Sequence, residues 1–174
     1  MTGRIFWKIS PVFIPTVYVH LRGPNTGLAI LDITDSLRSL ERYIELEQFQ
    51  GYDCYDALNS PILSALSFRN KNLRIAFIQA LKLSPINVRP LFLIRKGYNP
   101  KGIGLLLSAV SCLFRVTGDK NYLNKLEFFS NLLLNLSSKG YSGNCWGYNF
   151  DWQSRVVFVP KVTPTIVNTA YIGH

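Results

Sequence analysis

NPKGIGLLLSAVSCLFRVTGDKNYLNKLEFFSNLLLNLS, residues 99–137, decides the fold class of this chain. Apolar residues recur every three or four positions on both sides of Gly118, which is the period of an amphipathic helix. Gly118 is typical of the residue just beyond a helix end, and Asp119 is typical of the cap that opens the next helix. The stretch therefore predicts two helices, over residues 100–117 and 120–137, that form an antiparallel hairpin with a tight turn.

The sequence before this hairpin predicts three further helices and a connecting loop. A leucine-rich stripe covers residues 34–49, and Pro61 opens a second helix where its missing N–H costs little. Residues 73–83 form a third apolar helix, and the prolines and glycine of residues 84–99 indicate a loop. The side chains of the second helix expected to face inward are Ile62, Leu63, Leu66 and Phe68.

An aromatic segment, residues 140–169, follows the hairpin. It is too polar and too broken by glycine and proline for a helix, and too rich in aromatic residues for a disordered segment. We expect an ordered loop that builds a site, with a short strand at RVVFV, residues 155–159. Asn168 is expected to cap a new helix.

These patterns predict an all-α fold of antiparallel helical hairpins with long aromatic loops and at most a short strand pair. Residues 1–30 are rich in proline, β-branched and aromatic residues, and we expect an irregular N-terminal extension there. Residues 31–174 are expected to form the helical domain. Helical domains bury their apolar stripes pairwise, and little chain follows Asn168. We therefore expect an incomplete portion of a larger helical fold, or a chain that pairs with another.

Composition limits the classes of partner. The net charge is +9, and most basic residues follow residue 58. They are spread singly and no nucleic-acid motif accompanies them, so we expect no nucleic-acid partner. The basic half would equally suit an anionic sugar, a phosphate or a membrane surface.

Cysteine usage and apolar runs predict the compartment. The 3 cysteines lack metal-ligand spacing, so we expect free thiols, no metal and no cofactor. The apolar run at residues 11–21 is short and contains two prolines, so we expect no membrane span. No signal-peptide cleavage motif follows the basic start, and a cytoplasmic location is expected.

Three stretches carry a resemblance to a known family: GYDCYDALNSP at 51–61, KGYNPKGIGL at 96–105, and GYSGNCWGYNFDWQSR at 140–155 with PTIVNTAYIGH at 164–174. Together they resemble a family of uncharacterised bacterial proteins associated with surface-polysaccharide biosynthesis. The resemblance implies the (α/α) toroid of six-hairpin glycosidases. It covers residues 36–174, about the first half of such a protein, so the remaining hairpins or another chain would complete the fold.

Carboxylates and aromatic residues supply the candidate site. Sugar chemistry requires paired carboxylates, so Asp53, Asp56 and Asp151 are the candidate catalytic acids. Aromatic faces stack on sugar rings while amides bind hydroxyls. If residues 149–153 are extended, alternate side chains share one side of the strand. The candidate substrate-binding residues are Tyr55, Asn59, Trp146, Tyr148, Asn149, Trp152, Gln153 and Asn168.

Two structural alternatives stay open for these residues. Asp53 and Asp56 would equally stabilise a turn or the start of the following helix. The aromatic loop would equally pack on itself over the helix ends.

We therefore expect a protein that processes a carbohydrate or binds a glycan precursor, with glycoside hydrolysis as the enzymatic hypothesis. One alternative is a non-catalytic glycan-binding or scaffold protein. The other is a truncated fragment with no activity of its own.

Overall fold

A computed structural model describes residues 26–173, with side chains from residue 33 onward. The described chain is mostly helical, with a single two-stranded sheet, as the sequence predicts. Expectations for residues 1–25 and for His174 lie outside the described residues. The elements are α1 (Thr26–Leu46), the 3₁₀ helix η1 (Asp56–Asn59), α2 (Pro61–Leu66), α3 (Lys71–Leu83), α4 (Pro100–Thr117), α5 (Lys120–Asn135), β1 (Trp152–Gln153), β2 (Phe158–Val159) and α6 (Ile166–Gly173).

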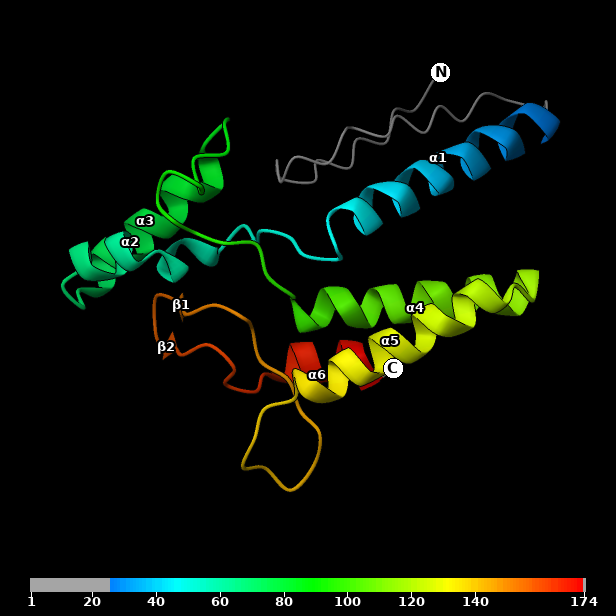
Figure 1. Ribbon diagram of the computed structural model, residues 1–174. Helices are drawn as coiled ribbons and strands as arrows, with labels where there is room; N and C mark the ends of the chain where they lie inside the picture. The colour runs from blue at the N-terminus through cyan, green and yellow to red at the C-terminus, as the bar shows by residue number, and fades with distance from the viewer. Residues whose placement is uncertain (1–25, 174) are drawn as a thin grey trace, which may run out of the picture.

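Helices α4, α5 and α6 form one packing unit, seen at the lower right of Figure 1. The Asn99 side chain caps α4 by accepting a hydrogen bond from the backbone N–H of Lys101, and Asp119 caps α5 in the same way. Gly118 takes the left-handed conformation, with φ 67°, which allows the tight turn between α4 and α5. The predicted antiparallel hairpin is confirmed, although α5 ends at Asn135 rather than at residue 137.

We call the apolar core of this unit the helical cluster. Its buried members are Ile103 and Val110 from α4 and Phe129 and Leu133 from α5. Half-buried side chains from outside the hairpin complete it, including Ile172 on α6 and Phe49 just after α1.

A second apolar core, which we call the pocket cluster, lies where η1, α2, α3 and the β1–β2 hairpin meet (Figure 1). The predicted helix start at Pro61 is confirmed, and the Ser60 hydroxyl caps it by accepting a hydrogen bond from the N–H of Leu63. The buried members are Ala57, Leu58, Leu63, Ile78, Leu81 and Ile94. Phe158 and Trp152 of the β hairpin pack against them.

The expected inward face of α2 is wrong at three of its four positions. Only Leu63 is buried, while Ile62 and Leu66 are exposed and Phe68 is 79% exposed. Helix α2 ends at Leu66, and Phe68 and Arg69 take positive φ values of 46° and 59°. Because α2 has only 6 residues, it makes fewer than two turns, and only Leu63 reaches the core.

Helix α1 also departs from expectation. It begins at Thr26, whereas the sequence places the helix start near residue 34, and it ends at Leu46 rather than near residue 49. The chain leaves the helix because Gln48 and Phe49 have positive φ values of 52° and 59°. The Phe49 ring then packs edge-on against Phe129 at 4.9 Å, which brings the end of α1 onto α5.

The strand predicted over residues 155–159 is only partly present. Strands β1 and β2 pair antiparallel, with Trp152 opposite Val159 and Gln153 opposite Phe158. Residues 154–157 form the turn between them, so the apolar run is split. The expected alternation over residues 149–153 is also wrong, because residues 149 and 150 lie in a bend and both Phe150 and Gln153 are buried.

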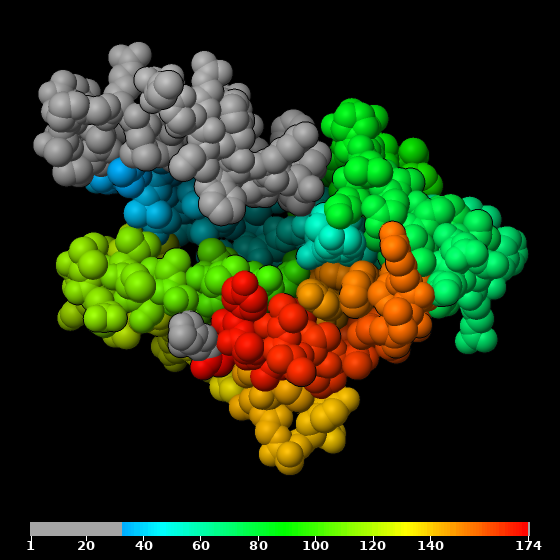
Figure 2. Space-filling model, turned by 180° about the vertical axis from the view of Figure 1, so that it is seen from behind, coloured from blue at the N-terminus to red at the C-terminus, as the bar shows by residue number. Residues whose placement is uncertain are grey.

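The loop after α5 divides into an exposed part and a packed part. Residues 139–144 are exposed and project from the molecule in Figures 1 and 2. Residues 145–154 are buried or half-buried, and the chain after them is again exposed in places. In Figure 2 the hairpin segment, in orange, lies between α6, in red, and the green segment of α2 and α3.

Within residues 26–173, α4 is long and apolar enough to cross a membrane by length and composition, with a mean hydropathy of 1.2. Core helices of soluble proteins meet the same criterion. In the described chain 22% of α4 is buried, and Ile103 and Val110 belong to that buried part.

Candidate functional site

The turn at residues 51–59 forms a hydrogen-bonded network that fixes Asp53 and Asp56. The backbone N–H of Asp53 donates to Oδ2 of Asp56 at 3.0 Å. Arg89 Nε donates to the other oxygen, Oδ1, at 2.8 Å, and Arg89 Nη2 donates to the Asp53 carbonyl at 2.8 Å. The turn is therefore tied to the loop that precedes α4.

The Asp56–Arg89 ion pair is buried. The Asp56 side chain is 4% exposed and that of Arg89 is 6% exposed. Burial raises the pKa of the Asp56 carboxyl, and the Arg89 guanidinium opposes that shift. Both Asp56 oxygens accept hydrogen bonds from neighbouring protein groups, so the structure accounts for Asp56 as a stabiliser of the turn.

Asp53 lies beside this pair and is half-buried. Its Oδ1 accepts a hydrogen bond from the N–H of Tyr55 and its Oδ2 accepts one from Asn99 Nδ2, both at 2.9 Å. Asn99 also caps α4, so Asp53 links the turn to the start of the helical cluster. Burial, followed by the charge of Asp53, raises the pKa of the nearby Cys54 thiol.

Aromatic side chains connect this turn to the β hairpin. The Tyr148 ring stacks on Phe150 at 5.0 Å between centroids and lies 6.5 Å from the Trp152 ring. Burial raises the pKa of the Tyr148 phenol, and the Asp53 carboxylate adds to the shift. The rings of Tyr148, Phe150 and Trp152 therefore form one connected group, and its Tyr148 member lies near Asp53.

Two amides close the same region. Asn59 Nδ2 donates to the Asn149 carbonyl at 3.3 Å, which joins η1 to the aromatic loop. Asn149 Nδ2 lies 3.1 Å from the position that a Cβ on Gly97 would take. Eight predicted residues are thus brought into one connected region: Asp53, Tyr55, Asp56, Asn59, Tyr148, Asn149, Trp152 and Gln153.

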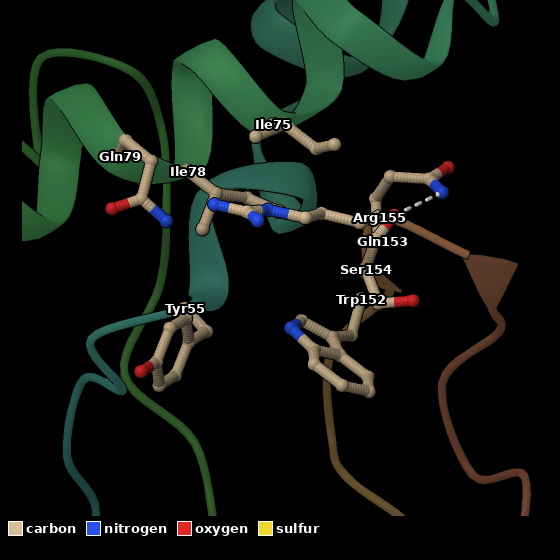
Figure 3. Close-up of a pocket in the computed structure, with 8 residues that line it drawn as sticks. All are labelled: Tyr55, Ile75, Ile78, Gln79, Trp152, Gln153, Ser154 and Arg155. Atoms are coloured by element: carbon tan, nitrogen blue, oxygen red, sulfur yellow. Dashed lines mark hydrogen bonds between the residues drawn. The ribbon is translucent and has the colours of Figure 1, made fainter. Parts of the chain in front are cut away.

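A half-open cavity of about 520 Å³ lies at the edge of this region, between α3 and the β hairpin. We call it the α3–hairpin pocket. Figure 3 shows the Tyr55 and Trp152 rings on the side opposite α3. Its volume is within the range of small-ligand sites. It is lined by Tyr55, Ile75, Ile78, Gln79, Trp152, Gln153, Ser154 and Arg155.

The walls of the pocket are held in place by hydrogen bonds. Lys82 Nζ donates to the Tyr55 hydroxyl at 2.9 Å and also lies 4.7 Å from the centre of that ring. Gln153 is buried, and its amide donates to the Ser154 carbonyl at 2.9 Å. Arg74 lies 4.2 Å above the Phe158 ring, so α3 and β2 are fixed to each other as well.

Three predicted site residues lie outside this arrangement. Trp146 is buried, and its Nε1 donates to the Leu133 carbonyl at 2.7 Å, so its ring belongs to the packing beside α5. Asn168 is 0% exposed and lies within α6, where Thr165 caps the helix by accepting the N–H of Asn168 at 3.2 Å. The expected helix cap at Asn168 is therefore wrong.

Asp151, the third residue, is used within its own loop. Its Oδ1 accepts a hydrogen bond from the N–H of Lys161 at 2.7 Å. This bond joins the two sides of the β hairpin at its base, so the Asp151 carboxylate has a structural role. Any catalytic role of Asp151 stays a prediction.

Sequence reasoning missed the hairpin turn that supplies two pocket residues, Ser154 and Arg155. The Ser154 hydroxyl accepts hydrogen bonds from the N–H groups of Val156 and Val157, at 3.1 and 2.8 Å. A serine that accepts from residues two and three positions later is a known turn signal. That signal was available in the sequence, but the apolar run after Ser154 favoured a strand.

Within the described part of the chain, no group of three or more His, Cys, Asp or Glu side chains is arranged to hold a metal ion. Comparisons with protein-family profiles, with curated proteins and with solved structures find no match to this chain.

Proposed function

We propose that this chain binds a carbohydrate or glycan precursor in the α3–hairpin pocket. The observation that carries the proposal is the pairing of Tyr55 and Trp152 on one wall of a cavity that also holds Gln79, Gln153 and Ser154. A sugar ring has apolar faces and polar edges. Aromatic rings bind the faces, and a few placed amides and hydroxyls bind the edges.

Binding without turnover fits the three candidate acids better than hydrolysis does. Glycoside hydrolysis requires two carboxylates that flank the scissile bond. Asp53, Asp56 and Asp151 each accept hydrogen bonds from neighbouring protein groups. The pocket-lining residues, all within the described range, include no Asp or Glu.

Substitution of Trp152 by leucine tests the proposal. Leucine keeps apolar bulk against the pocket cluster but removes the flat face that would stack on a sugar. A central tryptophan in a binding site contributes about 2 kcal/mol, so affinity should fall about thirtyfold. Isothermal titration with oligosaccharides retained on a glycan array measures the change.

Tyr141→Leu is the matched control, since Tyr141 is 58% exposed on the projecting loop and lies outside the pocket. Equal affinities of the Trp152 and Tyr141 variants would contradict the proposal. Release of shortened glycan by the unaltered protein would show that it hydrolyses its ligand, and would contradict binding without turnover.

We also propose that the helices belong to a partial (α/α) toroid of a cytoplasmic protein that serves surface-polysaccharide synthesis. The antiparallel pair α4–α5 supports this architecture, together with α6 packed on α4. Apolar side chains on the outer faces of these helices are exposed, as expected where further helices or another chain would pack: Val116, Leu123, Leu134, Ile166 and Tyr171. Self-association or binding of an apolar dye by the isolated chain would support this arrangement, and a monomer that binds no dye would contradict it.

A further inference from the structure

We infer that the saccharide bound in the α3–hairpin pocket is acidic, with its carboxylate or phosphate group held by Arg155. This inference rests on the proposed carbohydrate-binding function and specifies its ligand class. It goes beyond aromatic stacking, because rings alone do not distinguish charged from neutral sugars.

The position of Arg155 is the first observation. It lies in the turn between β1 and β2, and its backbone carbonyl accepts a hydrogen bond from Lys71 Nζ at 3.2 Å. Figure 3 shows its side chain extending across the pocket, between α3 and the Tyr55 and Trp152 rings. Among the described residues, no hydrogen bond or ion pair is recorded for its guanidinium group.

The charge of the surrounding wall is the second observation. Helix α3 carries Lys71, Arg74 and Lys82 and contains no acidic residue. Arg74 Nη1 donates to Gln153 Oε1 at 3.5 Å, and Lys82 Nζ donates to the Tyr55 hydroxyl at 2.9 Å. Both acceptors are neutral, so these cations orient the pocket walls while their charge is not cancelled.

Some basic side chains elsewhere in the described residues do have carboxylate partners. Arg89 pairs with Asp56, Lys96 with Glu47, and Lys125 with both Glu41 and Glu45. The ion pairs recorded in the described chain all lie outside α3 and the β hairpin. A cavity lined by one sign of charge raises the local concentration of the opposite ion.

Arginine suits the proposed ligand group in shape as well as in charge. Its planar guanidinium presents parallel N–H donors that match the two oxygens of a carboxylate or phosphate. The aromatic wall and the guanidinium are close enough to line one cavity. A sugar ring stacked on the aromatic wall would therefore place an acidic substituent within reach of Arg155.

A glycan array that pairs each acidic glycan with its neutral counterpart tests the inference. One set of pairs contains a uronate and the other a phosphorylated sugar, so the two sources of the anion are distinguished. We expect acidic members of at least one set to bind about tenfold tighter or more at low salt, with the difference falling as salt screens the charge. Equal binding of acidic and neutral members would overturn the inference and leave the proposed function intact. Retention of no glycan would instead contradict the proposed function.

Variants of Arg155 identify the group responsible. Arg155→Gln should reduce the ratio of acidic-glycan to neutral-glycan affinity to about one, and Arg155→Lys should keep part of the acidic preference. Arg115→Gln is the matched control, because Arg115 is exposed near the end of α4 that points away from α3 (Figure 1). An acidic preference that survives Arg155→Gln, or is lost equally in Arg115→Gln, would overturn the assignment. Arg155 is exposed, so thermal unfolding of its variants should match that of the unaltered protein.

Discussion

The helical cluster and the pocket cluster are similar in their number of apolar side chains but differ in how they are held together. In the helical cluster, α4 and α5 are neighbours in sequence, each opens on its own cap, and the core is aliphatic and aromatic. In the pocket cluster, short elements are joined by a buried ion pair and by hydrogen bonds between residues far apart in the chain. Contacts between helices that are neighbours in sequence therefore stabilise the helical cluster, whereas the pocket cluster depends on polar contacts between distant residues.

The largest effect should come from the buried ion pair of the pocket cluster. Asp56→Asn keeps the side-chain shape but leaves the buried Arg89 guanidinium without a counter-charge. Breaking a buried pair on one side costs about 3–5 kcal/mol of unfolding free energy. Chemical denaturation measures the loss.

Asp35→Asn is the control for this prediction. Asp35 pairs with Arg38 on α1, and both side chains are more than two-thirds exposed, at 72% and 71%. Exposed pairs contribute at most about 1 kcal/mol. If Asp56→Asn is no more destabilising than Asp35→Asn, the pocket cluster does not depend on its polar network.

Two glycines on α4 test the helical cluster. A Cβ at Gly104 would lie 2.9 Å from Ile172 Cγ1 and 3.4 Å from the Ile172 Cα on α6, whereas at Gly102 the nearest atom is 3.8 Å away. Alanine favours a helix over glycine by up to about 1 kcal/mol, but overpacking costs about 1–3 kcal/mol. Gly102→Ala should therefore be neutral or stabilising, and Gly104→Ala should be less stable than Gly102→Ala by about 1–3 kcal/mol.

Thermal unfolding compares the two alanine variants, and glycan titration should give the same affinity for both. Equal stability would mean that α6 is not packed closely on α4. A loss of glycan affinity in Gly104→Ala alone would mean that the two clusters are coupled.

The smallest effect concerns the contact of α1 with α5. Burial and then the Glu41 carboxylate raise the pKa of the Tyr122 phenol. For Lys125, burial lowers the pKa, but the interactions with Glu45 and Glu41 are larger together, so the pKa is raised overall. Both pKa values are higher in the folded state than the ordinary 10.0 and 10.5. The stabilisation is therefore complete below pH 10.0 and is lost as pH rises through the raised values.

We expect a loss of at most about 1 kcal/mol on the alkaline side, because the pairs are partly exposed. Denaturation between pH 8 and pH 11 measures it. Glu41→Gln should show a shallower loss over the same range. If stability falls equally with pH in the unaltered protein and in Glu41→Gln, the contact of Glu41 with α5 does not contribute to stability.

The sequence predicted the elements whose signals are local. Asn99–Pro100, Gly118 and Asp119 mark helix boundaries within a few residues, and the structure places the boundaries there. The α2 face was wrong because a six-residue helix has too few turns for periodicity to settle which side is buried. The start of α1 was missed because Gly23, Pro24 and Asn25, directly before Thr26, favour a turn as well as a helix cap.

The candidate site was predicted less completely than the helices. The turn at residues 51–59 and the aromatic residues 148–153 do come together, but through contacts such as Asn59 to Asn149 that a single sequence does not reveal. Arg155 was predicted to lie in a strand because an apolar run follows it. The structure instead has a turn that begins at Ser154. Trp146 was included for its residue type, although its indole serves the packing beside α5.

The indole N–H resonances of the tryptophans provide the most direct test of binding in the α3–hairpin pocket. Trp152 lines the pocket, whereas Trp146 Nε1 is buried against the Leu133 carbonyl and serves as an internal reference. The resonances are assigned by substituting Trp7, Trp146 and Trp152 one at a time. In a two-dimensional nitrogen–proton titration with an acidic oligosaccharide, we predict that the Trp152 indole peak shifts in a saturable way while the Trp146 peak stays in place. A saturable shift confined to Trp146 or Trp7, with Trp152 unchanged, would contradict the account.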